Sequence, residues 1–383
     1  MSWSLDGAPL GAILVSRLRF LGDVAMSTVV LEALRRGDPD LRLGYLCESP
    51  AAPLLAGDPR LRRLHVLARG TRGGGAAARP TAPGDGAGGG SSTATIAELR
   101  RARYDLSVDL FGNPRSALLL RLAGAPRRIG GDHGWRRRLA THPVAVPSPR
   151  QDPVFHAAAP GGLGELLGRL WPLVHLPSGL PFRDWYLREY PRGLTPRLHP
   201  SPSARSDAAL AALGVDAARP YLLFAPGATW PSKAWPRASW DELRVRLAGT
   251  DPRPVVELSA PGTALAVGAW VGGEPGGRLP AMGLADVMAV VAGADAVVTV
   301  DGGIAHVAVA CGRPTLALIG PTDPAIWFPY ESFGPFRAMC ARPACHPCDR
   351  HFCPPQEFVC LPALTAAAVV EALPLLGGSG AGR

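Results

Sequence analysis

The stretch that decides the fold is residues 297–324, VVTVDGGIAHVAVACGRPTLALIGPTDP. A β-branched run ends at an Asp-Gly-Gly sequence, and a helical pattern of small residues that contains His306 follows. A second apolar run then ends in Gly-Pro-Thr-Asp-Pro. A strand, a helix and another strand in this order are typical of a parallel α/β sheet. Ligands of such sheets bind beyond the carboxyl ends of the strands, where the start of a helix attracts anions.

The same alternation extends outward over the chain of 383 residues, which exceeds what one core needs. The proline-rich residues 186–206 are typical of a linker, and the Gly/Ala/Pro-rich residues 70–93 of a disordered insertion. We therefore expect two Rossmann-like, doubly wound α/β domains, residues 1–195 and 196–383, that face each other across a cleft. The predicted strands are 11–16, 41–47, 104–110, 220–225, 254–258, 296–300 and 314–319; the predicted helices are 24–36, 95–103, 115–123, 207–213, 236–248, 284–292, 304–310 and a closing 363–375.

The composition narrows the class of protein. The net charge of +9 favours nucleic acid, phosphorylated molecules or an anionic membrane as a partner, although a GC-rich genome would also produce an arginine bias. No apolar run is long enough for a membrane span, and the first residues do not form a typical signal peptide, which favours a cytoplasmic protein. No G-x-G-x-x-G follows the first strand, so dinucleotide redox chemistry has no support.

Two further segments place polar residues after predicted strands. In ILVSRLRFLGDVAMSTVVL, residues 13–31, Asp23 opens a helix as a cap or as a carboxylate able to take a proton. Arg17 and Arg19 beside it either hold an anionic acceptor or are surface charges. In LLFAPGATWPSKAWP, residues 222–236, Thr229 and Lys233 either hold a phosphate or lie in solvent.

Five cysteines crowd into the segment CARPACHPCDRHFCPPQEFVC, with two histidines between them. Reduced structural thiols, a structural zinc site and disulfides all fit this pattern, although a cytoplasmic location disfavours disulfides. The candidate ligands are Cys340, Cys345, Cys348, Cys353 and Cys360.

Taken together, these segments resemble glycosyltransferase family 9, the bacterial heptosyltransferases. The shared motifs occur in the family's order, and residues 104–130 also look like its middle segment. Gly302 stands where many members carry Thr. The matching motifs are Leu21-Gly22-Asp23, Pro226-Gly227 followed by Lys233 and Trp235-Pro236, Asp301-x-Gly303-x-x-His306, and Gly320-Pro321-Thr322 followed by Pro324.

The resemblance implies a GT-B fold and inverting transfer of a heptose from ADP-heptose to the lipopolysaccharide core, without an essential metal or cofactor. It implies an anionic glycolipid acceptor, peripheral contact with the inner membrane and no nucleic acid. By position, Asp23 is the general base. The implied donor-binding residues are Thr229, Lys233, Asp301, Gly302, Gly303, His306 and Thr322; the implied acceptor-binding residues are Arg17, Arg19, Asn113 and Arg115.

Two alternatives stay open. A family member of this kind could use another nucleotide-sugar and acceptor. A different class of protein, a basic nucleic-acid-binding or cysteine-based metal-binding protein, would explain the charge or the cysteines, although no recognised nucleic-acid-binding module is present.

Overall fold

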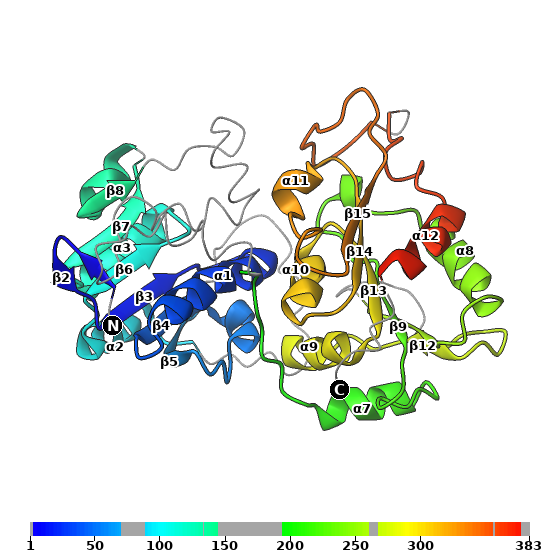
Figure 1. Ribbon diagram of the computed structural model, residues 1–383, viewed down its shortest axis with the longest axis horizontal. Helices are drawn as coiled ribbons and strands as arrows, with labels where there is room; N and C mark the ends of the chain where they lie inside the picture. The colour runs from blue at the N-terminus through cyan, green and yellow to red at the C-terminus, as the bar shows by residue number, and fades with distance from the viewer. Residues whose placement is uncertain are drawn as a thin grey trace. The chain divides into compact units, whose positions relative to one another are not determined.

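The computed structural model describes residues 3–69, 89–132, 134–144, 194–259, 267–354 and 357–376. These residues form two compact units, the first of which ends at His199 and the second of which begins its continuous part at Pro200 (Figure 1). Each unit has its own sheet with helices packed on it. The described residues thus have the two-part α/β organisation that the sequence predicts.

The first unit is built on a six-stranded sheet with the order β5-β4-β3-β6-β7-β8, in which every pair of neighbours is parallel. The central strand β3 is buried at every position, as expected for a parallel strand covered on both faces. Its elements are β1 (Ser4–Leu5), β2 (Ala8–Pro9), β3 (Ala12–Ser16), α1 (Leu21–Gly37), β4 (Arg42–Glu48), η1 (Ser49–Leu54), β5 (Leu61–Leu67), α2 (Ser92–Ala102), β6 (Leu106–Asp109), α3 (Pro114–Ala123), β7 (Arg127–Gly131), η2 (Gly134–Leu139) and β8 (His142–Val144).

The second unit is built on a seven-stranded sheet with the order β11-β12-β10-β9-β13-β14-β15, parallel except for the β11–β12 pair. Its core includes Trp235 and Trp240, whose rings meet edge to face. Its elements are α7 (Ala204–Ala211), β9 (Leu222–Ala225), η4 (Pro231–Lys233), α8 (Arg237–Ala248), β10 (Val255–Glu257), β11 (Gly268–Ala269), β12 (Gly276–Arg278), α9 (Leu284–Gly293), β13 (Ala296–Val300), α10 (Gly303–Ala310), β14 (Thr315–Ile319), α11 (Pro324–Trp327), β15 (Phe336–Cys340), α12 (Ala366–Ala372) and η5 (Leu373–Leu376).

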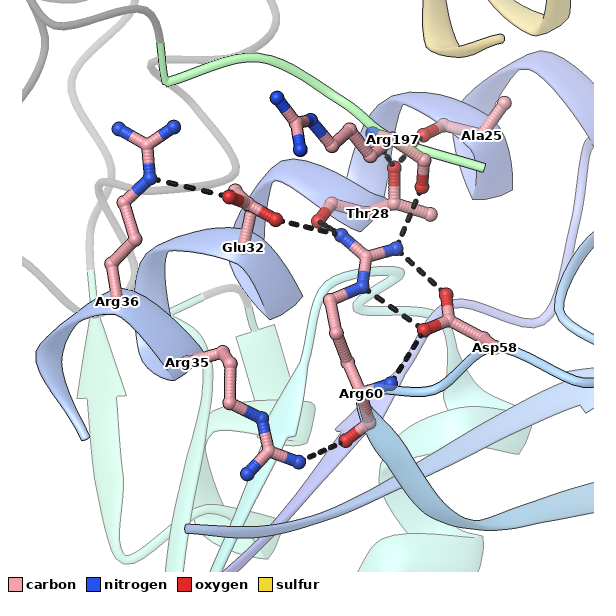
Figure 2. Close-up of polar contacts among 8 residues, drawn as sticks. All are labelled: Ala25, Thr28, Glu32, Arg35, Arg36, Asp58, Arg60 and Arg197. Carbon is pink, nitrogen blue, oxygen red and sulfur yellow. Dashed lines mark hydrogen bonds and ion pairs between the residues drawn. The ribbon is translucent and has the colours of Figure 1, made fainter. Parts of the chain in front are cut away.

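A buried ionic network fixes the end of the first unit to α1 (Figure 2). The Arg60 guanidinium pairs with Asp58 at 2.7 Å and Glu32 at 3.2 Å, and donates to the Arg197 carbonyl at 2.6 Å. The Arg197 amide donates in turn to Thr28 of α1 at 3.0 Å. Because buried charges are tolerated only when they are paired, this network specifies one position for residues 194–199 against the helix.

Two sequence predictions, the insertion at 70–93 and the closing helix at 363–375, need correction. Most of the predicted insertion lies outside the described residues, but Gly90 bridges to Leu67 and α2 begins at Ser92, so its predicted end at residue 93 is too late. The reason is local, because Ser91 caps the helix by accepting from the Ala94 amide. The predicted closing helix at 363–375 is shorter, since α12 covers only Ala366–Ala372 and a 3₁₀ turn follows.

The structure also bears on membrane insertion. Within the ranges that the structure describes, every helix is too short or too polar to pass through a bilayer.

Candidate functional site

The sheet order of the second unit brings together three loops that are far apart in sequence. Strands β9, β13 and β14 are neighbours and parallel, so their carboxyl ends share one edge. Lys233 follows β9, Asp301 follows β13 and Thr322 follows β14. The fold thus collects three of the predicted donor-binding residues at one place.

Asp301 is the centre of this group. Its carboxylate is buried, accepts a hydrogen bond from the buried Thr322 hydroxyl, and lies 2.7 Å from the Lys233 ammonium through Oδ2. A charge-assisted pair in a buried position is held firmly, because either partner alone would be left unpaired away from water. Lys233 keeps further N–H donors for an anion beside Asp301.

Helix α10 starts directly after Asp301. Gly302 has an extended backbone at the N-cap and no side chain forms a capping hydrogen bond there, so the N–H groups at the start of α10 remain available to an anion. One turn on, the buried His306 forms a hydrogen bond of 2.8 Å through Nδ1 with the Tyr330 hydroxyl. This hydrogen bond fixes the orientation of the His306 ring through Nδ1, and Nε2 is the other polar atom of that ring. Tyr330 was not predicted from the sequence.

Aromatic side chains position Lys233. Its ammonium lies 4.2 Å from the centre of the Trp230 ring, and the His351 ring stacks on Trp230 at 3.8 Å. Cation–π attraction therefore adds to the ion pair in holding the lysine. Thr229, one residue before Trp230, is exposed.

The cysteine-rich segment is the source of His351, and its backbone braces the same loops. The Ser232 hydroxyl donates to the Arg350 carbonyl at 2.6 Å, and the Cys348 and Asp349 amides donate to the Pro321 carbonyl at 2.9 and 3.0 Å. His346 Nε2 lies 2.9 Å from the Thr322 carbonyl and 3.1 Å from Cys340 Sγ. The segment therefore forms a second layer behind Lys233 and Thr322.

The cysteines themselves do not form a recognisable metal centre. Over the ranges that the structure describes, no group of three or more His, Cys, Asp or Glu side chains is arranged to hold an ion, and the cysteines are unbridged. Burial raises the pKa of the Cys340 and Cys360 thiols. The zinc alternative therefore gains no support here.

In the first unit, the predicted base lies at the carboxyl edge of the sheet. Asp23, in the first turn of α1, pairs with Arg17 at 3.0 Å and accepts from the Phe20 amide at 3.0 Å. Arg17 also donates to the Leu110 carbonyl at 2.7 Å and lies over the Phe111 ring, near which Arg19 is found as well. Asp23 is thus both a helix cap and a fixed carboxylate.

The other two predicted acceptor residues already have intramolecular partners. Asn113 caps α3 by accepting from the Ser116 amide at 2.8 Å. Arg115 pairs with Glu48 at 2.8 Å and donates to the Ala68 carbonyl at 3.2 Å. Glu48 ends β4, two strands away from β6, and it was not predicted from the sequence.

The chain is similar in sequence to a known family and to proteins of that family. The family model described as glycosyltransferase family 9 (heptosyltransferase) matches residues 189–354. Lipopolysaccharide heptosyltransferase 1 of Pseudomonas aeruginosa is 39% identical over 110 residues, which cover 28% of this chain and 31% of that protein. Lipopolysaccharide heptosyltransferase 2 of Escherichia coli is 28% identical over 242 residues, which cover 59% of this chain and 62% of that protein. The chain thus matches about a third of the length of the first relative.

Solved structures match over nearly the whole chain. The structure of E. coli ADP-heptose lps heptosyltransferase II aligns with a TM-score of 0.68 and 22% identity, covering 95% of this chain and 98% of that one. E. coli heptosyltransferase WaaC with ADP-2-deoxy-2-fluoro heptose aligns with a TM-score of 0.60 and 21% identity, covering 94% of this chain and 98% of that one. These matches confirm the predicted GT-B fold class.

Proposed function

We propose that this chain, whose residues 189–354 match the model of glycosyltransferase family 9, is a glycosyltransferase that moves a heptose onto a lipopolysaccharide core. The donor in this proposal is ADP-heptose and the acceptor is an anionic glycolipid. The observation that carries the proposal is the grouping of Lys233, Asp301 and Thr322 beside the start of α10. A cation and free N–H groups at one edge of a sheet suit the pyrophosphate of a nucleotide-sugar.

The proposed reaction is a single displacement. Asp23 takes the proton of the acceptor hydroxyl, whose oxygen forms a bond to the anomeric carbon as the bond from that carbon to the ADP oxygen breaks. Attack opposite to the leaving group inverts the anomeric centre. Lys233 and the start of α10 stabilise the negative charge that ADP gains, so this chain's own residues provide the stabilisation that a metal would otherwise supply.

The remaining predicted residues complete the proposal. Thr229, Gly302, Gly303 and His306 surround the donor, with the glycines giving it close access to the backbone. Arg17, Arg19, Asn113 and Arg115 contact the acceptor, and we propose that the domains 1–195 and 196–383 close over both substrates. The reaction takes place on the cytoplasmic side of the inner membrane, with peripheral contact and no nucleic acid.

The test is a nucleotide panel followed by a transfer assay. Thermal unfolding of the full chain is measured with ADP, UDP, GDP and TDP, and we expect the largest stabilisation with ADP. ADP release from ADP-heptose is then measured with a lipopolysaccharide precursor that lacks heptose, with and without EDTA. Equal activity in EDTA is expected.

Two outcomes would contradict the proposal. Preference for another nucleotide would favour the alternative of a different donor, to which Gly302 in place of Thr also points. Loss of transfer in EDTA that Mg²⁺ restores would overturn the metal-independent mechanism.

A further inference from the structure

A cavity lies at the amino edge of the first unit's sheet, opposite the edge that holds Asp23. Its volume is about 190 Å³. On the same measure a single water needs roughly 10–15 Å³, so the cavity has room for a polyatomic anion. Its lining comes from the amino ends of β3, β4 and β5, the end of α2 and the residues before β6. We call it the amino-edge pocket; its charged and polar side chains are Arg42, Arg62, Arg63, Arg101 and Tyr104.

An irregular register explains how two consecutive residues of β5 reach one pocket. Neighbouring residues of a strand normally point to opposite faces. The β4–β5 pairing shifts from Leu43–Leu61 to Gly44–Arg63, which leaves Arg62 as an extra residue without a partner. An extra residue of this kind re-aims side chains. Both Arg62 and Arg63 consequently line the amino-edge pocket.

The charges of this pocket are poorly compensated. Arg63 has one long ion pair, 3.7 Å to Glu98. For Arg42, Arg62 and Arg101, the part of the chain that the structure describes offers no carboxylate within ion-pair distance. All four side chains are exposed at the pocket. Gathering four like charges around one cavity is unfavourable unless an anion joins them.

The lining of the pocket also includes an uncharged polar side chain, Tyr104. Tyr104 is buried at its side, with its hydroxyl 2.8 Å from His65 Nε2. Burial raises the pKa of Tyr104 to about 12, and the neighbouring Arg63 and Arg42 charges act in the opposite direction. Arg42 on β4 and Arg63 on β5 line the pocket together with Tyr104, so charges from two strands converge on one cavity.

We propose that the amino-edge pocket binds a phosphate group. Guanidinium groups bind phosphate oxygens in a bidentate manner, and a phosphate has enough oxygens to accept from several arginines on different sides, whereas a carboxylate has two. This site is separate from the proposed donor and acceptor residues, and it does not depend on the proposed function. Its phosphate comes from solution or from a lipid headgroup.

The experiment compares three full-length proteins by calorimetric titration with inorganic phosphate: the natural chain, the double variant R62A/R101A, and the control R121A/R219A. All four substituted arginines are exposed, so both variants lose the same charge and are expected to fold. We expect phosphate to bind at least about tenfold more weakly to R62A/R101A and within about twofold of normal to the control. Phosphate bound near α10 is common to all three proteins and does not affect the comparison.

A vesicle arm identifies the source of the phosphate. Flotation is measured with vesicles of phosphatidylcholine alone and of phosphatidylcholine mixed equally with phosphatidic acid. Loss of flotation specific to R62A/R101A assigns the site to a lipid headgroup; unchanged flotation with weakened phosphate binding assigns it to a soluble phosphate. Equal phosphate affinity in R62A/R101A and the control would overturn the proposal.

Discussion

The two carboxyl edges hold their charged side chains in different ways. In the second unit, the Lys233 and Asp301 side chains are 11% and 6% exposed, and residues more than 100 positions from Lys233 in the sequence brace its loop. In the first unit, Arg17 and Asp23 are 17% and 22% exposed, and Asp23 is held by residues close in sequence. The proposed donor edge is therefore fixed by tertiary packing, whereas the proposed base is fixed by a helix start.

The largest expected effect tests the first-unit side of this comparison, the proposed base Asp23. Asp23→Asn keeps an oxygen that accepts from the Phe20 amide but removes the proton acceptor. We expect transfer to fall by about 10²- to 10⁴-fold, the usual contribution of a general base, with ADP affinity unchanged. Initial rates and calorimetry with ADP measure the two quantities. A variant that retains near-normal transfer would show that Asp23 acts only as a cap.

The second prediction concerns Lys233. Lys233→Met removes a charge-assisted contact of about 1.5–3 kcal/mol, which corresponds to roughly a ten- to hundredfold loss of ADP affinity. Asp301 keeps its hydrogen bond from Thr322, so the fold is expected to survive, which circular dichroism checks. Exposed Arg205, on α7, provides a control when changed to Ala. Unchanged ADP affinity in the Lys233 variant would remove the lysine from the donor site.

A smaller effect sharpens the role of the second layer. His351→Ala removes the ring that stacks on Trp230, worth about 0.5–1.5 kcal/mol. We expect a two- to tenfold rise in KM for the donor and little change in kcat, because His351 acts only through the position of Lys233. Phe352→Ala, at a side chain that is 73% exposed, is the matched control in the same segment. Equal KM values for the two variants would argue against a bracing role.

The smallest expected effect is on stability in the first unit. Burial lowers the pKa of His199 below its ordinary value of 6.5, so the unfolded chain binds more protons there as the pH falls through that range. The free energy of unfolding should therefore decrease below about pH 6.5, and the histidine's share of this decrease should disappear in His199→Asn. Urea unfolding at pH 7.5 and 5.5 measures the difference. An identical pH dependence in both proteins would contradict the assignment.

The sequence predicted those parts of the fold that local patterns of neighbouring residues determine. Apolar runs identified the central strands β3, β9, β13 and β14, and the Asp-Gly-Gly junction identified the start of α10. It did not predict β15, because Phe336–Cys340 is only partly buried and lacks a clear apolar pattern. Nor did it predict the end of α12, which Pro374 limits.

Contacts between distant residues were beyond sequence reasoning. The bond from His306 to Tyr330, the stacking of His351 on Trp230 and the pairing of Arg115 with Glu48 all join separate loops. Their partners carry no local pattern that marks them. The sequence also did not reveal that the cysteine-rich segment supports the loops of Lys233 and Thr322, because most of these contacts use backbone atoms.

The Arg60 network has a consequence for motion. Since Arg60 and Thr28 attach the backbone of Arg197 to α1, residues 194–199 must travel with the first unit. The stretch between this anchored segment and α7 is short, since only Pro200-Ser-Pro-Ser separates His199 from the first residue of the helix. Proline fixes φ at two of these four positions, so the backbone there has few free torsions.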